Sequence, residues 1–550
     1  MEARAVRRSY AQGSTSVPLL GETIGERFDH AVARFGEREA LVVPHQEIRW
    51  TYSHLGGEVD RLARALLASG IEVGDRVGIW APNCVEWVLA QFATAKVGAI
   101  LVNVNPAYRA SELEYALGQS GTRMLISAVS FKNSDYAEMI EQVAPRLPSL
   151  ERVVLLGSPS WGEMLAAGDA IPASGLHERM ASLDFDDPIN IQYTSGTTGF
   201  PKGATLSHHN ILNNAFFVGQ ACNYTEVDRI CVPVPFYHCF GMVMGSLSAV
   251  VHGAATIVPA PSFEPEAVLR AVAAERCTSL YGVPTMFIAE LMHPAFAQYD
   301  LSSLRTGIMA GSPCPIEVMK RVVDEMHMEQ VAICYGMTET SPVSTQTSAD
   351  DTSERRVKTV GRVHPHVEIK LVDPLSGRTV PRGVPGELLT RGYSVMLGYW
   401  DDPKRTAEAI DEARWMHTGD MATMDEEGYL NIVGRSKEMV IRGGENVYPR
   451  EIEEFLHSHP DIAEVAVIGV PDVKFGEEIM AWVRLRDGAD CSEAQVREFC
   501  RGGIAHFKVP RYVRFADELP MTVTGKIQKF KLREAAIAEL GLEHHIQATA

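Results

Sequence analysis

The sequence predicts an α/β protein: a large N-terminal domain of two α/β subdomains plus a small β-rich subdomain, followed by an α+β C-terminal domain. A chain of 550 residues is too long for one compact core, so at least two domains are expected. Helical patterns alternate with short β-rich runs over residues 20–135 and 205–340, as in βαβ units on a largely parallel sheet. From about residue 355 the pattern changes to short alternating segments between Gly, Pro and Asp turns, which is typical of a β-rich subdomain.

The two alternating stretches have similar element orders without an internal sequence repeat, so they are interpreted as two halves of one domain. In the first stretch we expect helices at 61–67, 87–97 and 111–117, and strands at 76–80, 99–104 and 123–126. In the second we expect helices at 210–219, around Gly245 and at 265–274, and strands at 230–234, 255–258 and 279–281.

A break at 434–437 separates the remaining elements from this large domain. Beyond it the patterns predict helices at 450–457 and 492–500, strands at 464–470, 480–485 and 512–515, and a terminal helix. The N-terminal domain is therefore expected to span 1–434, a connection 435–437, and the C-terminal domain 438–550.

Composition excludes several classes of function. The formal net charge is −19, from 51 basic and 70 acidic residues, which argues against a general nucleic-acid or membrane-surface binder. No apolar run reaches the ~18 residues of a membrane helix. The nine cysteines are scattered and include no Cys-x-x-Cys pair, which favours reduced, buried thiols in the cytoplasm. The basic N-terminus lacks a hydrophobic region, so it is no secretory signal; a mitochondrial matrix location is the alternative.

A Gly- and Thr-rich stretch, 194–203, carries the most specific chemical signal. It follows a strand expected at 189–193 and precedes Ser207, a good helix N-cap. Glycines allow close backbone approach, successive amides can form an anion-binding concavity, and Lys202 adds a positive charge. The stretch is not a Walker A loop, because Pro201 precedes the lysine, and a plain surface loop is the alternative. The candidate phosphate-binding residues are Thr194, Ser195, Gly196, Thr197, Thr198, Gly199 and Lys202.

Further candidate residues follow strands or turns later in the chain. Glu339 offers the carboxylate oxygen that Mg²⁺ prefers, beside Thr338 and after a strand at 331–334. His238 ends the string Phe-Tyr-His and has a packed or capping histidine as its alternative interpretation. Lys526 lies in a Thr- and Gly-flanked turn, where an ammonium can swing into a closed site and neutralise charge.

Residues 193–203 resemble the phosphate-binding signature of the adenylate-forming enzymes, which include acyl-CoA synthetases, luciferases and peptide-synthetase adenylation domains. The resemblance covers about 20–535, with every motif in family order, and within the family it is closest to medium-chain fatty-acyl-CoA synthetases. It implies a mobile C-terminal domain and roles for individual residues. Gly311, Ser312 and Pro313 would wrap the adenine; Tyr335 would stack on it beside Gly336; Thr338 would contact phosphate; Glu339 would bind Mg²⁺; His238 would border the acyl carboxylate; Asp420 would accept the ribose hydroxyls; Arg435 would contact ribose or phosphate; Lys437 would be the hinge; Gly443 and Gly444 would line the pantetheine tunnel; and Lys526 would be the catalytic lysine.

The implied reaction has two steps and uses ATP, Mg²⁺ and coenzyme A. A carboxylate displaces pyrophosphate from ATP, and the CoA thiol then displaces AMP from the acyl-adenylate. An apolar pocket of Val283, Met286, Met337 and Val343 favours alkyl or aryl acids, and a medium-chain fatty acid is the expected substrate. Aryl-acid ligases, a free-standing amino-acid-activating enzyme, a light-emitting enzyme and an inactive nucleotide sensor are the alternatives. A homodimer is left open.

Overall fold

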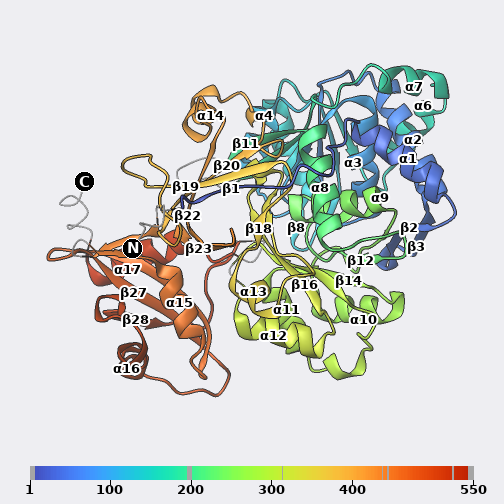
Figure 1. Cartoon of the computed structure of the whole chain (residues 1–550). Coiled ribbons are helices and arrows are strands. Elements are labelled where there is room, and N and C mark those ends of the chain that lie inside the picture. The colour runs from blue at the N-terminus through green and yellow to red at the C-terminus, as the bar shows by residue number, and fades with distance from the viewer. Residues whose placement is uncertain are drawn as a thin grey trace.

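A computed structural model of the chain describes residues 7–194, 201–312, 314–435, 438–442, 445–522 and 526–542 (Figure 1). Two large sheets, a smaller antiparallel sheet and a C-terminal sheet organise these residues. No helix in these ranges is long and apolar enough to cross a membrane. All nine cysteines are unpaired, and eight of them are buried.

The first large sheet has seven strands, and the candidate phosphate loop connects two of them. Its core is parallel, as the βαβ rhythm predicted, and an antiparallel pair is added at one edge. In spatial order the strands are β21 (Gly398–Tyr399), β11 (Lys202–Ser207), β10 (Pro188–Thr194), β5 (Ile100–Asn103), β4 (Arg76–Trp80), β6 (Met124–Ser127) and β9 (Arg152–Leu155).

The second large sheet has nine strands, and two of them come from the first part of the chain. β2 and β3 pair at one end of this sheet. We had expected each half of the large domain to come from one continuous stretch, and this sheet shows that the second half does not. In spatial order the strands are β18 (Arg362–Val363), β17 (Val343–Gln346), β16 (Gln330–Gly336), β15 (Thr306–Ala310), β14 (Ser279–Gly282), β12 (Arg229–Cys231), β13 (Ala255–Ile257), β2 (Glu39–Val43) and β3 (Ile48–Thr51).

Helices cover these sheets and fill the space between them. α3 is buried on almost every side, which fits its uniformly apolar sequence. The helix expected around Gly245 is a buried π-helix, η3 (Phe240–Leu247), that continues into α9. The helices are α1 (Ile24–Phe35), α2 (Tyr52–Ala68), α3 (Val85–Val97), α4 (Ala110–Ser120), α5 (Tyr136–Val143), α6 (Pro159–Gly168), α7 (Ala173–Met180), α8 (His208–Ala221), α9 (Ser248–His252), α10 (Pro265–Glu275), α11 (Pro284–Leu291), α12 (Ile316–Glu325) and α13 (Ser353–Lys358).

The β-rich subdomain is an antiparallel five-stranded sheet, as its turn-rich sequence predicted. The N-terminal strand β1 adds to its edge by pairing with β19. In spatial order the strands are β1 (Tyr10–Gln12), β19 (Val367–Val372), β20 (Gly386–Gly392), β22 (Met416–Met424) and β23 (Leu430–Arg435); α14 (Pro403–Ala409) lies in the connection between β21 and β22.

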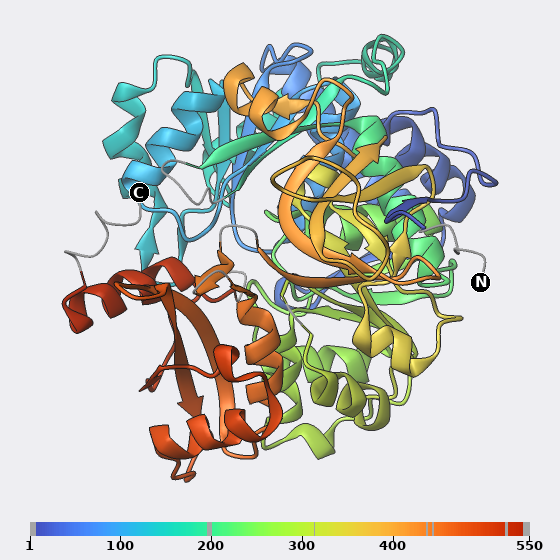
Figure 2. The same cartoon turned by 60° about the vertical axis from the view of Figure 1, so that its left-hand side comes forward.

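The last part of the chain forms its own α+β unit with a separate apolar core. In both views its orange-to-red elements lie to one side of the remaining chain (Figures 1 and 2). Its strands are β25 (Glu445–Val447), β24 (Val440–Arg442), β27 (Gly476–Leu485) and β26 (Ile462–Asp472), with β28 (Tyr512–Phe515) on β27; its helices are α15 (Pro449–His457), α16 (Glu493–Gly503) and α17 (Lys529–Leu540). The predicted fold class, a large α/β N-terminal domain followed by a small C-terminal domain, is confirmed.

One buried carboxyl group in α11 is without a partner and gives a pH-dependent stability. Glu290 is 1% exposed, and neither of its carboxyl oxygens has a hydrogen bond to the described residues. Burial raises the pKa of Glu290 well above its ordinary value. The folded protein therefore keeps this group protonated at pH values where the unfolded chain ionises it, and stability falls as pH rises through that window.

We expect Glu290→Leu to raise the melting temperature more at pH 8 than at pH 5, because it removes a buried polar group whose desolvation costs about 1–3 kcal/mol. Differential scanning fluorimetry at the two pH values measures this. The control is Glu163→Leu on the exposed side of α6, which should change neither melting temperature. An equal or larger gain at pH 5 would contradict a raised pKa at Glu290.

Candidate active site

The ends of the candidate phosphate loop are held together by strand pairing. Thr194 is the register partner of Lys202, and Tyr193 that of Gly203, in the antiparallel pair β10–β11. The loop therefore joins two neighbouring strands, whereas the sequence had suggested a strand followed directly by a helix. Ser195, Gly196, Thr197, Thr198 and Gly199 lie outside the described residues. The hydroxyl of Ser207 does cap α8, as predicted, by accepting the backbone N–H of Asn210.

The Glu339 side chain contacts one end of this loop and a residue of a third segment. It is 5% exposed, in the short turn after β16. The Tyr399 hydroxyl donates to Glu339 Oε1 at 2.9 Å, and Thr194 Oγ1 donates to the same oxygen at 3.4 Å. Lys202 Nζ lies 4.8 Å from the centre of the Tyr399 ring. Three distant segments thus converge, and Tyr399 is a site residue that the sequence analysis missed.

The position of Tyr399 depends on the edge strand β21, which no local sequence pattern predicted. β21 pairs with β11 through Tyr399 and Ala204, and the Trp400 backbone N–H donates to the Gly203 carbonyl at 2.7 Å. The only signal in the sequence was the string 391–400 used for the family resemblance.

The environment of Glu339 suits a magnesium ion. Both hydrogen bonds to its carboxylate reach Oε1, and among the described residues none reaches Oε2. A largely buried carboxylate oxygen beside the candidate phosphate loop is the type of ligand that Mg²⁺ takes, with substrate phosphates and water completing its shell. The residues present therefore fit the metal, and Glu339 would hold it.

A second polar group is built on the β-rich sheet. Asp420 and Arg435 are register partners on β22 and β23, and Arg435 Nε lies 3.1 Å from Asp420 Oδ1. The Tyr335 hydroxyl donates to Asp420 Oδ2 at 2.7 Å. Burial raises the pKa of Asp420, against the opposing effect of Arg435, and burial likewise raises the pKa of Tyr335. The sequence thus folds three separately predicted residues into one connected group.

His238 is fixed as a neutral histidine with a defined tautomer. The Phe240 backbone N–H donates to His238 Nδ1 at 3.0 Å, which places the ring proton on Nε2. Burial, and then the positive charge of Lys526, lower the pKa of His238 to about 3. The neighbouring Cys239 Sγ lies 3.8 Å from Thr338 Oγ1, so this turn touches the segment that carries Glu339.

Lys526 reaches this site from the C-terminal unit. The Thr522 N–H donates to the Lys526 carbonyl at 2.7 Å, and the Lys526 N–H donates to Thr522 Oγ1 at 3.0 Å, which holds its turn. Lys526 is exposed, and desolvation by the surrounding protein and then the charge of Arg435 lower the pKa of its ammonium. Asp420, Cys239 and Glu339 have the opposite effect and raise this pKa. The charges of the large domain therefore act on the Lys526 ammonium.

The remaining predicted residues divide into those that the structure places and those it does not. Gly311 follows β15 with φ of +91°, a conformation that favours glycine, and Ser312 comes next. A Cβ on Gly336 would lie 1.8 Å from the Pro342 carbonyl oxygen, so no larger residue fits there. Pro313, Lys437, Gly443 and Gly444 lie outside the described residues.

Comparison with known proteins agrees with this geometry. The AMP-binding enzyme family profile matches residues 28–400, and that of the AMP-binding enzyme C-terminal domain matches 451–526. The chain is 49% identical to the putative acyl-CoA synthetase YngI of Bacillus subtilis, over 95% of this chain and 99% of that protein. It is 44% identical to the mitochondrial medium-chain acyl-CoA ligase ACSF2 of Homo sapiens, over 97% and 91%.

Solved structures of other enzymes have a similar overall fold. The anthranilate CoA ligase AuaEII in complex with anthranoyl-AMP superposes with a TM-score of 0.83 at 29% identity, over 95% of this chain and 98% of that one. A Mycobacterium tuberculosis fatty acyl CoA synthetase superposes with a TM-score of 0.72 at 30% identity, over 94% and 99%. With both family profiles, these relatives and the converging site residues, the chain belongs to the AMP-binding enzyme family, as an AMP-forming acid–CoA ligase of the acyl-CoA synthetase type.

Proposed function

We propose that this ligase activates a medium-chain fatty acid, first as its acyl-adenylate and then as its CoA thioester. The observation that carries the proposal is the convergence of Thr194, Tyr399 and Glu339 beside Lys202, together with the connected group of Tyr335, Asp420 and Arg435. The relatives named as medium-chain acyl-CoA ligases support the choice of acid.

In the proposed first step, these residues position two anions that repel each other. Lys202 and the loop amides bind the ATP phosphates, and the His238 Nε2–H donates to the fatty-acid carboxylate. Lys526 neutralises charge as a carboxylate oxygen attacks the α-phosphorus and pyrophosphate leaves. A magnesium ion held by Glu339 would supply further charge neutralisation at the phosphates. No nucleophile on the enzyme is required, so the rate acceleration comes from positioning the reactants and from electrostatic stabilisation of the transition state.

The alkyl chain is proposed to enter the apolar core beside His238. Val283, Met286 and Val343 are buried in one apolar cluster, and Met337 packs against it. The same cluster contains Phe236 and Phe240, which flank the histidine turn. In an environment of aliphatic and aromatic side chains, each buried methylene of the substrate strengthens binding. A second charged group on the substrate would find no partner there.

For the second step, we propose that the C-terminal domain, 438–550, rotates about Lys437 relative to 1–434. Gly443 and Gly444 would then line the approach of the CoA thiol, which displaces AMP from the acyl group. A cytoplasmic location and a homodimer complete the proposal; cell fractionation and light scattering test them.

A panel of carboxylates tests the substrate. We expect kcat/KM for CoA-dependent AMP release to peak between about C6 and C12, because each buried methylene contributes about 0.8 kcal/mol until the pocket is full. The panel runs from C2 to C18 and includes benzoate, cinnamate and anthranilate. Fastest turnover of acetate or of an aryl acid would reject the medium-chain assignment, whereas amino-acid-dependent AMP release would indicate an amino-acid-activating enzyme.

A further inference from the structure

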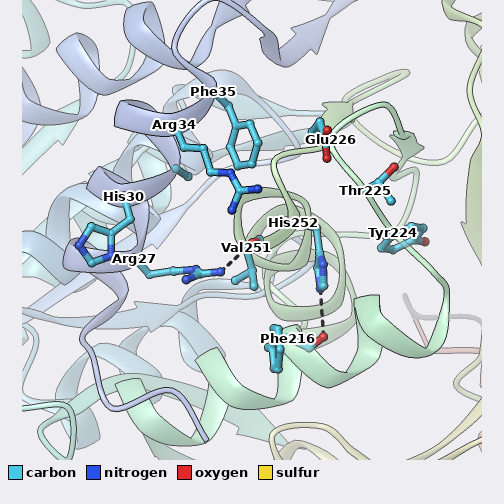
Figure 3. A pocket seen from close by; sticks show the side chains of 11 residues that line it. Arg27, His30, Arg34, Phe35, Phe216, Tyr224, Thr225, Glu226, Val251 and His252 are labelled. Carbon is cyan, nitrogen blue, oxygen red and sulfur yellow. Dashed lines mark hydrogen bonds between the residues drawn. The ribbon is translucent and has the colours of Figure 1, made fainter. Parts of the chain in front are cut away.

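A cavity of about 580 Å³ lies outside the candidate active site, between α1, α9 and the segment at the end of α8 (Figure 3). Its volume is within the usual range for small-molecule sites. None of the residues assigned to ATP, CoA or the acyl chain lines it. The lining combines cationic side chains from α1 with aromatic rings from the other elements.

Two arginines reach the cavity from the same face of α1, and they differ in how they are held. Arg27 donates to Glu22 Oε1 at 3.2 Å and to the Val251 carbonyl at 3.1 Å, so its charge is compensated. Arg34 has no hydrogen bond or ion pair with any residue that the structure describes. Its guanidinium lies 5.1 Å from the centre of the Phe35 ring and points into the cavity (Figure 3). In a chain of net charge −19, this is an uncompensated cation facing an open volume.

The aromatic part of the lining is fixed in orientation. The His252 Nε2–H donates to the Phe216 carbonyl at 3.0 Å, and the two rings are nearly parallel, with 3° between their planes and 5.7 Å between their centres (Figure 3). The Tyr224 ring stands at 70° to His252, with its centre 6.4 Å away. Burial lowers the pKa of His252, so its ring is neutral and does not add to the charge of Arg34. These flat surfaces suit a planar ligand.

A single carboxylate on the rim limits the charge of the ligand. Glu226 lines the cavity near Phe35 (Figure 3). The Arg38 guanidinium donates a hydrogen bond to the Glu226 backbone carbonyl. One free guanidinium opposed by one carboxylate favours a ligand with a single compact anionic group and disfavours polyanions such as ATP or CoA.

We propose that this cavity binds a small aromatic anion, a planar ring that carries one phosphate or one carboxylate. Arg34 forms the bidentate ion pair with the anionic group, and the ring lies against the Phe216, Tyr224 and His252 side chains. The site shares no lining residue with the catalytic one, so the aromatic anion and the substrates can bind at the same time.

Isothermal titration calorimetry tests the site while the catalytic site is saturated with a non-reactive acyl-adenylate analogue. The probes are phenyl phosphate, benzoate and inorganic phosphate; the first two distinguish a phosphate from a carboxylate head group. We expect one of the two aromatic anions to bind at one per chain, with an affinity that falls as salt is raised. Arg34→Glu should weaken this binding by about ten- to a hundredfold, the effect of losing a charge-assisted hydrogen bond.

Two variants serve as comparisons. Arg61→Glu makes the same charge change at an exposed position on α2 and should leave binding unchanged. Arg34→Lys keeps the charge but loses the planar fork, and should give an intermediate affinity. Because Arg34 is exposed, its replacement does not threaten the fold. Absence of binding by both aromatic anions, unaltered affinity in Arg34→Glu, or binding of inorganic phosphate as tight as that of the bound aromatic anion would each overturn the proposal.

Discussion

Lys526→Ala is expected to slow acyl-adenylate formation by about 10²–10³-fold, the range for losing one preorganised group that stabilises developing charge. The reason is electrostatic: the charges of Arg435, Asp420 and Glu339 act on the Lys526 ammonium, which would neutralise charge as carboxylate and α-phosphate are brought together. Thioester formation from chemically supplied acyl-adenylate should be spared. Single-turnover kinetics of each half-reaction, measured separately, provides the test.

Two other variants make this test specific. Lys531→Ala removes an exposed lysine from α17 of the same domain and should leave both half-reactions unchanged. Gly444→Trp, at a residue outside those described, should block CoA and spare adenylation. Equal losses in both steps for Lys526→Ala and Gly444→Trp would refute the division of labour between the two loops.

The lowered pKa of Lys526 adds a pH dependence to the same measurement. The protonated amine is the active form, so adenylation should decline as pH rises through a pKa below the ordinary value of a lysine. His238 titrates at about 3 and stays neutral over the working range. A decline of adenylation below pH 7 would therefore have to come from another group.

Glu339→Gln is the second change with a large expected effect, a loss of about 10²-fold in adenylation at low Mg²⁺. The amide keeps the volume and can still accept the Tyr399 hydrogen bond, so the variant removes charge with little change in packing. A Mg²⁺ titration of the single-turnover rate should show weakened Mg²⁺ binding, so that high Mg²⁺ partly restores the rate.

Tyr399→Phe is the matched variant, because it removes the hydrogen bond to Glu339 and keeps the carboxylate charge. We expect it to cost less than about tenfold, the scale of one neutral hydrogen bond. If Glu339→Gln and Tyr399→Phe had the same small effect, Glu339 would serve to position Tyr399 and would have no role toward the metal.

Elements governed by local patterns could be predicted from the sequence. The strand expected at 76–80 is β4, and the helix expected at 87–97 is α3 with two more residues at its start. Their signals are a short apolar run and a long apolar segment, which need no knowledge of distant residues. The same holds for the turn-rich β-sheet after 355.

Elements defined by their partners could not be predicted. β11 reads Lys-Gly-Ala-Thr-Leu-Ser, a short segment with a glycine and no clear alternation, and it is a strand because β10 and β21 pair on its two sides. Tyr399 enters the site for the same reason. The tautomer of His238 depends on a backbone N–H two residues away, which composition does not specify.

The strand pairings of the N-terminal segment govern the order in which a newly synthesised chain can complete its sheets. Tyr10 on β1 pairs with Lys370, and Leu41 on β2 pairs with Thr256, so both strands leave the ribosome long before their partners. The nine-stranded sheet is complete only when β18 has emerged, the seven-stranded sheet only with β21, and the β-rich sheet only with β23. Nascent chains shorter than about 400 residues thus carry unpaired strand edges. Such edges promote aggregation, which chaperone binding would prevent. The C-terminal unit differs: it has its own sheet and core, and its strands follow one another within one short stretch of the chain.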